Sequence, residues 1–234
     1  EKMTEINNLP TECAKFFTEL EENNNRMWFE KNKPRFQTKI LNPLRQLVGQ
    51  VGEKLHSLSP EIIADPRINK SIFRINRDLR FSRDKSPYKT HQGVIFWNGN
   101  MVKLESPGFY LHLDTDYIYI GGGYHLFPKK ELEIFRRSLE NPIHNDRLYS
   151  IIQELQSSGY SIDGKHYKRY PKGFDSNIAN QEYLLFKGLW AYRRISEFDK
   201  ICNPDFVENI FNIFQDFYPL YEFLCEVIYH QSYE

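Results

Sequence analysis

The N-terminal part of the chain has the three-four spacing of apolar residues that predicts amphipathic helices. The first helix is expected to begin at Thr11, a residue type favoured at helix N-caps. The run Asn23–Asn25 should interrupt it, because short amide side chains compete for backbone hydrogen bonds. A second helix is expected from Arg26 to about Lys33, and a third from Pro43 to Ser57. Residues 11–60 are therefore predicted to be helical.

Between residues 71 and 121 the pattern changes to short β-rich runs, some of which alternate apolar and polar residues. Phe109 to Leu113 is the clearest case, with Phe109, Leu111 and Leu113 on one face and Tyr110, His112 and Asp114 on the other. The predicted strands are residues 71–75, 94–97, 109–113 and 117–120. Short links between the last three favour an antiparallel meander, since parallel pairs need long crossovers.

The remainder of the chain is predicted to be helical and mixed, over residues 128–230. Helices are expected at 128–139, 145–156 and 177–187, an irregular stretch at 160–175, and a strand at 189–195. Pro204 should start an aromatic C-terminal helix, and Pro219 should kink or restart it. That helix is core or, alternatively, a dimer face. We expect one α+β domain over residues 1–234, in which helices from both termini pack around an antiparallel sheet.

Composition fits a soluble globular protein, with 40% hydrophobic and 26% charged residues among 234. No apolar run is long enough to span a membrane, and the N-terminus lacks the apolar core of a signal peptide. The three cysteines, Cys13, Cys202 and Cys225, have no disulfide or zinc spacing and are predicted to be buried in a reducing compartment. A cytoplasmic location is expected.

Charge is balanced over the whole chain but concentrated in one segment. Lys plus Arg and Asp plus Glu each number 31, which argues against a general polyanion-binding surface. Between Arg67 and Lys89, however, eight basic residues face only two acidic ones, Asp78 and Asp84. A neutral protein with one strongly positive segment should have a positive site rather than a positive surface.

This segment carries a motif, F-R-I-x-R-D-x-R-F-S-x-D-K-x-P-Y-K-T, from Phe73 to Thr90. With it the chain resembles an uncharacterised family, domain of unknown function 2461. The pairs Asn24-Asn25 and Trp28-Phe29 fit the resemblance, as does Gly121–Gly123 followed by Arg136-Arg137. It implies a shared fold and a shared site, and it names no activity, cofactor or substrate.

If the segment is extended, Arg74 and Arg80 share one face, and Arg77 joins the apolar row of Phe73, Ile75, Leu79 and Phe81. An arginine in an apolar row needs a carboxylate, here Asp78 or a distant Glu. We therefore expect Arg77 and Asp78 to form a bracing pair, with Asp84 in a turn that runs to Pro87.

Three interpretations of the segment compete. The working hypothesis is a pocket for a small anion that bears a phosphate or carboxylate group. In it, Arg74 and Arg80 would clamp the anion, Lys85 and Lys89 would add charge, and Tyr88 would be a wall or hydrogen-bond donor. The alternatives are a nucleic-acid contact surface and a purely structural Arg/Asp network.

Other signals are weaker. Gly121–Gly123 is either an anion nest or a tight strand exit, and the basic loop at 167–173 is a surface turn or the second wall of a cleft. The histidines form no metal-binding motif, so no metal site is predicted, and a site built from distant residues is left as the alternative. His91 and His112 fall on expected strands near the basic segment, where either could act as acid or base. No nucleophile stands out, which leaves open whether the protein is an enzyme.

Overall fold

The chain passes from helices to strands and back to helices, as the hydrophobic pattern predicts. The computed structural model describes residues 5–80, 82–174, 177–202 and 205–229, so Phe81 and Pro204 lie outside the described residues. The helices are α1 (Leu9–Glu22), α2 (Arg26–Phe36), α3 (Asn42–Leu58), α4 (Lys129–Ser138), α5 (Pro142–Ser157), α6 (Phe198–Cys202) and α7 (Phe206–Tyr229), with a π-helical turn at Gln37–Leu41 and a 3-10 helix at Gln181–Leu185.

Six strands form one antiparallel sheet in the order β1-β2-β3-β4-β6-β5. They are β1 (Ile62–Ile63), β2 (Gln92–Asn98), β3 (Gly108–Leu113), β4 (Ile118–Tyr124), β5 (Ser161–Lys165) and β6 (Phe186–Ile195). The α+β class and the meander of β2, β3 and β4 are confirmed. The strand β5 lies in a stretch that was expected to be irregular.

Backbone contacts divide the chain into two compact units. Unit 1 comprises Glu1–Phe96, Tyr110–Ile120 and Arg194–Asn212, and unit 2 comprises Trp97–Phe109, Gly121–Arg193 and Ile213–Glu234. The residues of the basic segment and the neighbouring histidines all belong to unit 1. The single domain over residues 1–234 stays a prediction.

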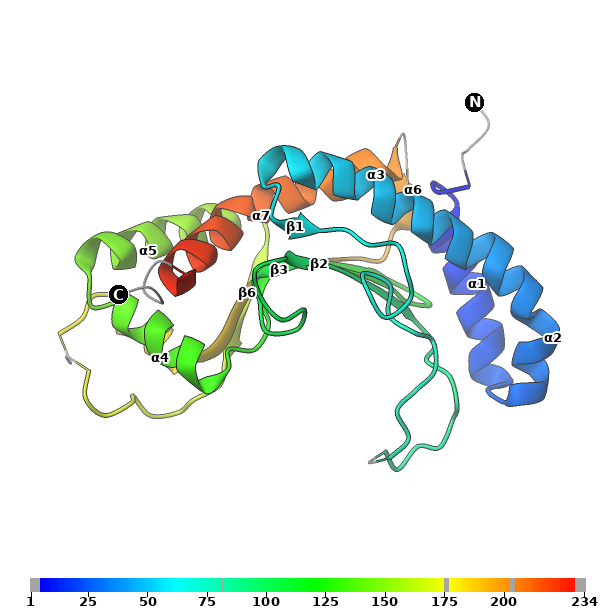
Figure 1. Cartoon of the computed structure of the whole chain (residues 1–234), viewed down its shortest axis with the longest axis horizontal. Coiled ribbons are helices and arrows are strands. Elements are labelled where there is room, and N and C mark those ends of the chain that lie inside the picture. The colour runs from blue at the N-terminus through cyan, green and yellow to red at the C-terminus, as the bar shows by residue number, and fades with distance from the viewer. Residues whose placement is uncertain (1–4, 81, 175–176, 203–204, 230–234) are drawn as a thin grey trace. The chain divides into compact units, whose positions relative to one another are not determined.

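The α2 helix of unit 1 begins at Arg26 as predicted, whereas α1 begins at Leu9, before the expected N-cap at Thr11, and α3 begins at Asn42. The α1 helix ends just before the asparagine run, and the side chain of Asn25 caps α2 by accepting a hydrogen bond from the backbone N–H of Trp28 at 3.0 Å. The helices α1 and α2 lie side by side (Figure 1). Their apolar faces enclose Phe16, Phe29 and Phe36, which form one aromatic cluster.

The two faces of β3 and β4 in unit 1 differ in character. Leu111, Leu113, Ile118 and Ile120 are buried, and the side chains between them, Tyr110, His112, Tyr117 and Tyr119, are only partly buried. Because successive residues of a strand point to opposite faces, the apolar set supplies core and the polar aromatic set forms the other face. That second face is where the candidate site lies.

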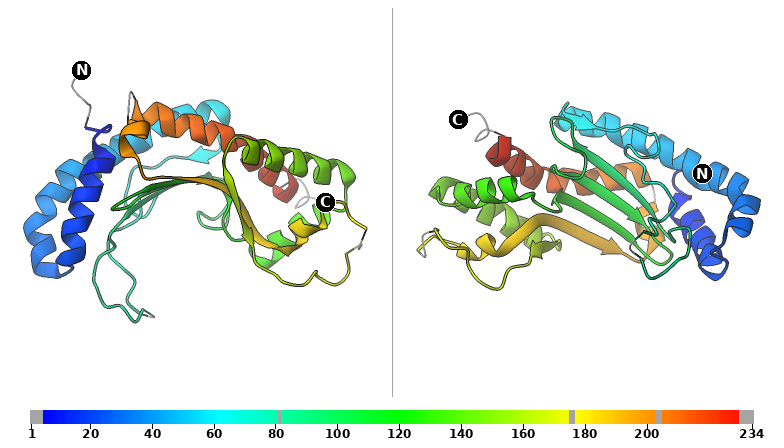
Figure 2. Two further views of the ribbon diagram at one scale, coloured as in Figure 1. Left: turned by 180° about the vertical axis from the view of Figure 1, so that it is seen from behind. Right: turned by 60° about the horizontal axis from the view of Figure 1, so that its bottom comes forward.

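We call residues 73–90 the arginine loop. This loop projects from the strands as two arms, one running outward and one returning (Figures 1 and 2). Its two arms are joined by an antiparallel bridge between Asn76 and Tyr88, and the N–H of Lys89 donates to the carbonyl of Ile75 at 2.8 Å. The predicted strand at 71–75 is reduced to an isolated bridge between Ile72 and Val94.

In unit 2 the glycine run belongs to β4 and packs tightly. A Cβ on Gly122 would lie 2.7 Å from the Cβ of Phe217, so only glycine lets α7 approach this strand. This close approach fits a packed strand rather than an anion nest. Pro219 lies inside α7, which continues through it as one helix. No helix in the described ranges could span a membrane.

The two neighbouring arginines of α4, Arg136 and Arg137, make separate contacts within unit 2. Arg136 is buried, lies 4.8 Å from the ring centroid of Tyr167 and donates to the carbonyl of Leu184 at 3.0 Å. Arg137 pairs with glutamates of its own helical segment and donates to the carbonyl of Gly173 at 3.0 Å. The loop at 167–173 therefore packs on the arginines of α4.

The three cysteines are all at least partly buried. Cys13 and Cys202 are buried and Cys225 is half-buried, and all three are free thiols. Burial raises the pKa of Cys202 to about 11 and that of Cys225 to about 12, which suppresses the reactive thiolate.

Candidate functional site

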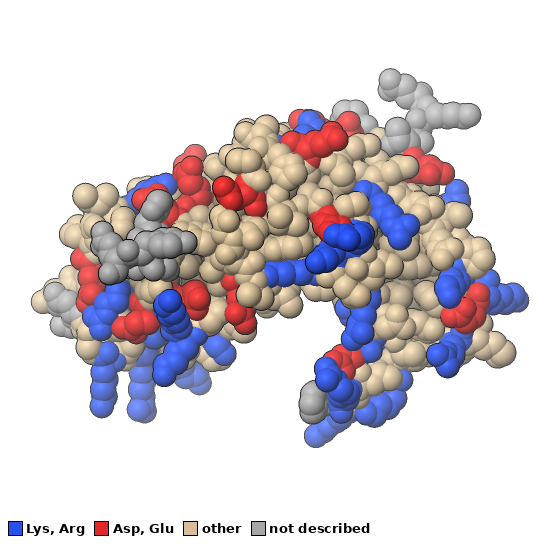
Figure 3. Space-filling model, viewed as in Figure 1, with Lys and Arg blue, Asp and Glu red and all other residues tan. Residues whose placement is uncertain are grey.

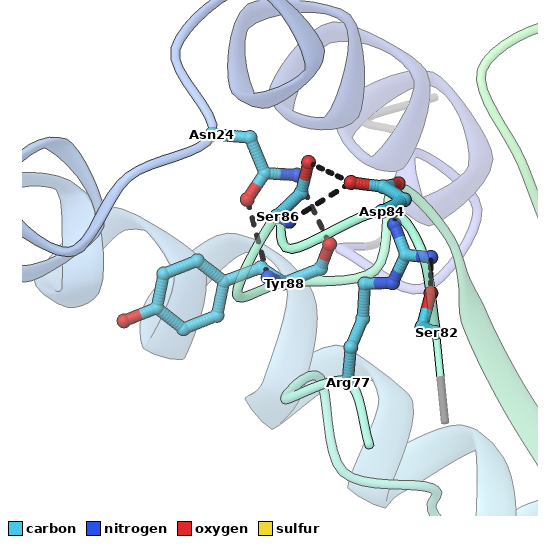
Figure 4. A network of polar contacts seen from close by, with 6 residues as sticks. All are labelled: Asn24, Arg77, Ser82, Asp84, Ser86 and Tyr88. Atoms are coloured by element: carbon cyan, nitrogen blue, oxygen red, sulfur yellow. Dashed lines mark hydrogen bonds and ion pairs between the residues drawn. The ribbon is translucent and has the colours of Figure 1, made fainter. Parts of the chain in front are cut away.

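We call the part of the arginine loop between Arg77 and Ser86 its tip. There, the side chain of Asp84 contacts the residues that hold the turn together (Figure 4). It forms an ion pair with Arg77 and accepts hydrogen bonds from the hydroxyl of Ser86 at 2.6 Å and from the Ser86 N–H at 2.9 Å. These two hydrogen bonds and the Arg77 guanidinium lower the pKa of Asp84 to about 2. Arg77 is half-buried, and a charged side chain in such a place needs a partner of opposite charge. The carboxylate of Asp84 is that partner.

A second ion pair at the tip joins Arg80 to Asp78. Arg80 Nη2 lies 2.6 Å from Asp78 Oδ2, and Arg80 Nε donates to Asp78 Oδ1 at 3.0 Å. Lys85 Nζ donates to the carbonyl of Leu79 at 3.0 Å. The expected pair of Arg77 with Asp78 is thus replaced by two other pairs. The turn brings Asp84 back to Arg77, and Asp78 pairs instead with Arg80, two residues further along the chain.

The surface of the tip shows the same pairing. In Figure 3 acidic side chains (red) lie directly against basic ones (blue) where the loop projects at the lower centre. The tip is therefore a region of mixed charge, although the sequence around it is strongly basic.

Tyr88 is buried at the loop's base and is not among the residues that line the cavity described below. Its ring is 5% exposed and stacks on Phe29 at 4.1 Å between ring centroids. Asn24 holds its backbone from both sides: Asn24 Nδ2 donates to the Tyr88 carbonyl at 3.0 Å, and the Tyr88 N–H donates to Asn24 Oδ1 at 3.1 Å (Figure 4). The asparagine pair and the central motif thus form one structural unit.

Beside this anchor lies a cavity of about 160 Å³ within unit 1. Its lining residues are Phe73, Arg74, Lys89, His91, Gln92, Gly93 and Tyr110. A Cβ on Gly93 would lie 2.8 Å from the Tyr110 hydroxyl, so the absence of a side chain there leaves room for that hydroxyl. Of the five residues expected to bind a ligand, the structure brings Arg74 and Lys89 together at this cavity.

The two cations of the cavity differ from Arg77 and Arg80 of the tip, which are ion-paired. In the described part of the chain no ion pair joins a carboxylate to Arg74 or to Lys89. Burial, and after it the positive charge of Arg74, lowers the pKa of Lys89. Lys89 Nζ also lies 5.6 Å from the ring centroid of Phe73, where it faces the ring rather than an anion.

Next to the cavity a polar chain runs along one face of β3 and just beyond its end. The Tyr110 hydroxyl lies 3.0 Å from His112 Nδ1, and His112 Nε2 lies 3.0 Å from Asp114 Oδ2. These residues are two apart in an extended segment, so their side chains share a face. Burial of Asp114 would raise its pKa, but hydrogen bonds from His112, Thr115 and Tyr117 outweigh it, and the pKa is lowered.

His91 completes this group. Its ring stacks on that of His112 at 4.3 Å between centroids, and burial, followed by the charge of His112, lowers its pKa to about 4. One ligand atom from each of His91, His112 and Asp114 lies within 4.8 Å of the others. Sequence reasoning pointed to the two histidines but missed Tyr110 and Asp114. The alternation along residues 109–114 was the signal that could have found them.

Comparison with known proteins confirms the family resemblance. The family model described as Conserved hypothetical protein (DUF2461) matches residues 12–223. No curated protein matches the chain, and no solved structure does. Because the match spans most of the sequence, from α1 into α7, this chain belongs to the DUF2461 family of conserved hypothetical proteins.

Proposed function

We propose that the cavity of unit 1 binds a small anionic molecule through a phosphate or carboxylate group, held by Arg74 and Lys89. The observation that carries this proposal is the convergence of two cations on one cavity without an ion-pair partner among the described residues. The other expected ligand residues have different roles. Arg80 and Lys85 bind oxygens at the tip, and Tyr88 packs in the core.

Electrostatics favours an anion at this place. Burial, and after it the charge of Arg74, lowers the pKa of Lys89, so the two positive charges raise each other's free energy. A bound anion would reverse the sign of that interaction for both residues. The guanidinium of Arg74 can bind two oxygens of a phosphate or carboxylate at once, and the ammonium of Lys89 adds a point charge.

The size of the cavity limits what it can hold. Pockets for drug-sized molecules measure about 300–1,000 Å³, and this one measures about 160 Å³. It therefore suits one anionic group with a few attached atoms. The partly apolar lining from Phe73 and Tyr110 would face the uncharged part of the ligand.

A thermal-shift titration tests the proposal. The full chain, freed of metal beforehand by passage over a chelating resin, is titrated with inorganic phosphate, acetate, simple phosphate monoesters and a short oligonucleotide. We expect a saturable rise of the melting temperature with at least one small anion, abolished in Arg74→Gln and Lys89→Gln. Arg83→Gln, an exposed cation of the tip, is the matched control and should keep the shift.

Two outcomes would contradict the proposal. In one, no small anion shifts the melting temperature of the wild type. In the other, Arg83→Gln reduces the shift as much as Arg74→Gln, which indicates a diffuse charge effect. Binding of the oligonucleotide alone, with a steep dependence on salt, would support the nucleic-acid alternative instead.

A further inference from the structure

The polar group beside the cavity has the composition of a metal site. We propose that His91, His112 and Asp114 bind one divalent transition-metal ion, of the class of zinc, iron(II) or cobalt(II). The inference rests on the juxtaposition of three side chains from two segments of unit 1, and it does not require the anion proposal to hold.

The ligand atoms are spaced for a shared ion. One ligand atom from each of the three side chains lies within 4.8 Å of the other two, and His112 Nε2 and Asp114 Oδ2 are 3.0 Å apart. In a tetrahedral site with bonds of about 2.0–2.1 Å, ligand atoms lie about 3.3 Å from one another. The distance between the His112 and Asp114 ligand atoms is already near this value. Rotation of the His91 side chain would bring its ring nitrogen to a similar distance from both.

The surroundings orient these ligands in the way that metal sites require. The Tyr110 hydroxyl at 3.0 Å from His112 Nδ1 fixes the imidazole so that Nε2 faces Asp114. The second oxygen of Asp114 accepts the N–H of Thr115 at 2.8 Å, and Tyr117 also hydrogen-bonds to this carboxylate. Partners of this kind hold ring and carboxylate orientation in known metal centres.

The donor set selects the class of metal. Two imidazoles and one carboxylate suit zinc and iron(II), whereas magnesium and calcium prefer oxygen ligands. Three protein ligands leave at least one coordination position for a further group. His91 also lines the cavity with Arg74 and Lys89, so that position can face the cavity.

This placement couples the metal to the anion, a step that rests on the proposed function. His91 lines the same cavity as Arg74 and Lys89, so these two positive charges should oppose binding of a metal ion by His91. An anion held between them would remove this opposition. Metal and anion should then each raise the affinity of the other by the same factor.

Calorimetric titration of the metal-free full chain with Zn²⁺, Co²⁺ and Mg²⁺ tests the site. We expect one equivalent of Zn²⁺ and of Co²⁺ to bind, visible-region absorption from the bound Co²⁺, and no binding of Mg²⁺ at the same concentration. His112→Gln and Asp114→Asn should each weaken Zn²⁺ binding by more than about tenfold. His166→Gln, an exposed histidine of unit 2, is the control and should bind as the wild type does.

A variant that keeps all three ligands separates a loss of metal binding from a loss of folding. Tyr110→Phe retains all three ligands and should lower Zn²⁺ affinity by about tenfold without changing the stoichiometry. Thermal melting of each metal-free variant shows whether it is folded, and His91→Gln replaces any ligand variant that is not. The proposal is overturned if the wild type binds neither Zn²⁺ nor Co²⁺ in the micromolar range, or if the ligand variants bind as tightly as the wild type.

The two proposals fail separately. Phosphate binding measured on the metal-free chain without a soluble chelator reports on Arg74 and Lys89, and Zn²⁺ binding measured without phosphate reports on His91, His112 and Asp114. A histidine–aspartate group that binds no metal would leave the Tyr110–His112–Asp114 chain as a hydrogen-bonded brace of the strand face.

Discussion

The tip of the arginine loop and its base, where Arg74 and Lys89 lie, belong to one sequence motif but differ in the partners of their positive charges. At the tip, Arg77 and Arg80 are paired with Asp84 and Asp78. At the base, Arg74 and Lys89 meet at a cavity, with no ion-pair partner among the residues described. Charge density in a sequence therefore does not indicate which cations are available to a ligand.

Sequence distance explains the difference between the two regions. The pairs of the tip join residues two and seven positions apart, so a turn is enough to form them. Arg74 and Lys89 are far apart along the chain, and the antiparallel bridge between Asn76 and Tyr88 brings them together. Local structure pairs Arg77 and Arg80 of the tip with carboxylates, and tertiary structure brings the two cations of the base together.

The largest expected effect comes from the anchor of the base. Phe29→Ala removes the ring that stacks on Tyr88, and deleting a buried phenylalanine lowers the free energy of unfolding by about 3–5 kcal/mol. Urea unfolding followed by circular dichroism measures the loss. Tyr88→Phe keeps the stack and is the control, with an expected change of less than about 1 kcal/mol. A small loss in Phe29→Ala would show that the base does not depend on this contact.

Asn24→Ala should have the next largest effect. It removes both hydrogen bonds to the Tyr88 backbone and leaves a donor and an acceptor without their partner, which lowers the free energy of unfolding by about 1–3 kcal/mol. Asn24→Asp keeps the acceptor and loses the donor, so its unfolding midpoint in urea should lie between those of Asn24→Ala and the wild type. Equal midpoints for all three proteins would contradict the role of Asn24.

Acid should weaken the tip selectively. The pKa of Asp84 is about 2 in the folded protein against 3.8 normally, so the unfolded chain takes up the proton first as the pH falls. The stabilisation by Asp84 is therefore present above about pH 4 and lost as the pH approaches 2. The gap in urea midpoint between the wild type and Asp84→Asn should be wide at pH 6 and narrow at pH 2.5. A gap that does not change with pH would contradict this account.

Arg80→Gln should have the smallest effect on stability and thereby sharpen the comparison. Its ion pair with Asp78 is exposed, and solvent screens such pairs strongly. We expect an unfolding midpoint within experimental error of the wild type and unchanged anion binding. A loss of anion binding in this variant would place the ligand at the tip instead of the base.

The sequence predicted local features of the fold and site better than long-range ones. Alternation along residues 74–80 places Arg77 in the partly buried row, and the asparagine run marks the boundary between α1 and α2. Both follow from backbone geometry over a few residues.

Features that depend on distant segments could not be read in the same way. The stack of Tyr88 on Phe29 joins α2 to the loop, and the approach of His91 to His112 joins the start of β2 to β3. Spacing rules for metal motifs search neighbouring residues, so they miss a cluster assembled across two strands. The pairing of Arg77 with Asp84 rather than Asp78 depends on the conformation of the turn, which no local pattern specified.

Calorimetric titration of phosphate into the wild type, Arg74→Gln and Arg80→Gln tests the central claim most directly. If the base of the loop holds the available charge, the wild type and Arg80→Gln bind phosphate with the same affinity, and Arg74→Gln shows no measurable heat of binding. Equal losses in both variants, or no binding by the wild type, would contradict the distinction between base and tip.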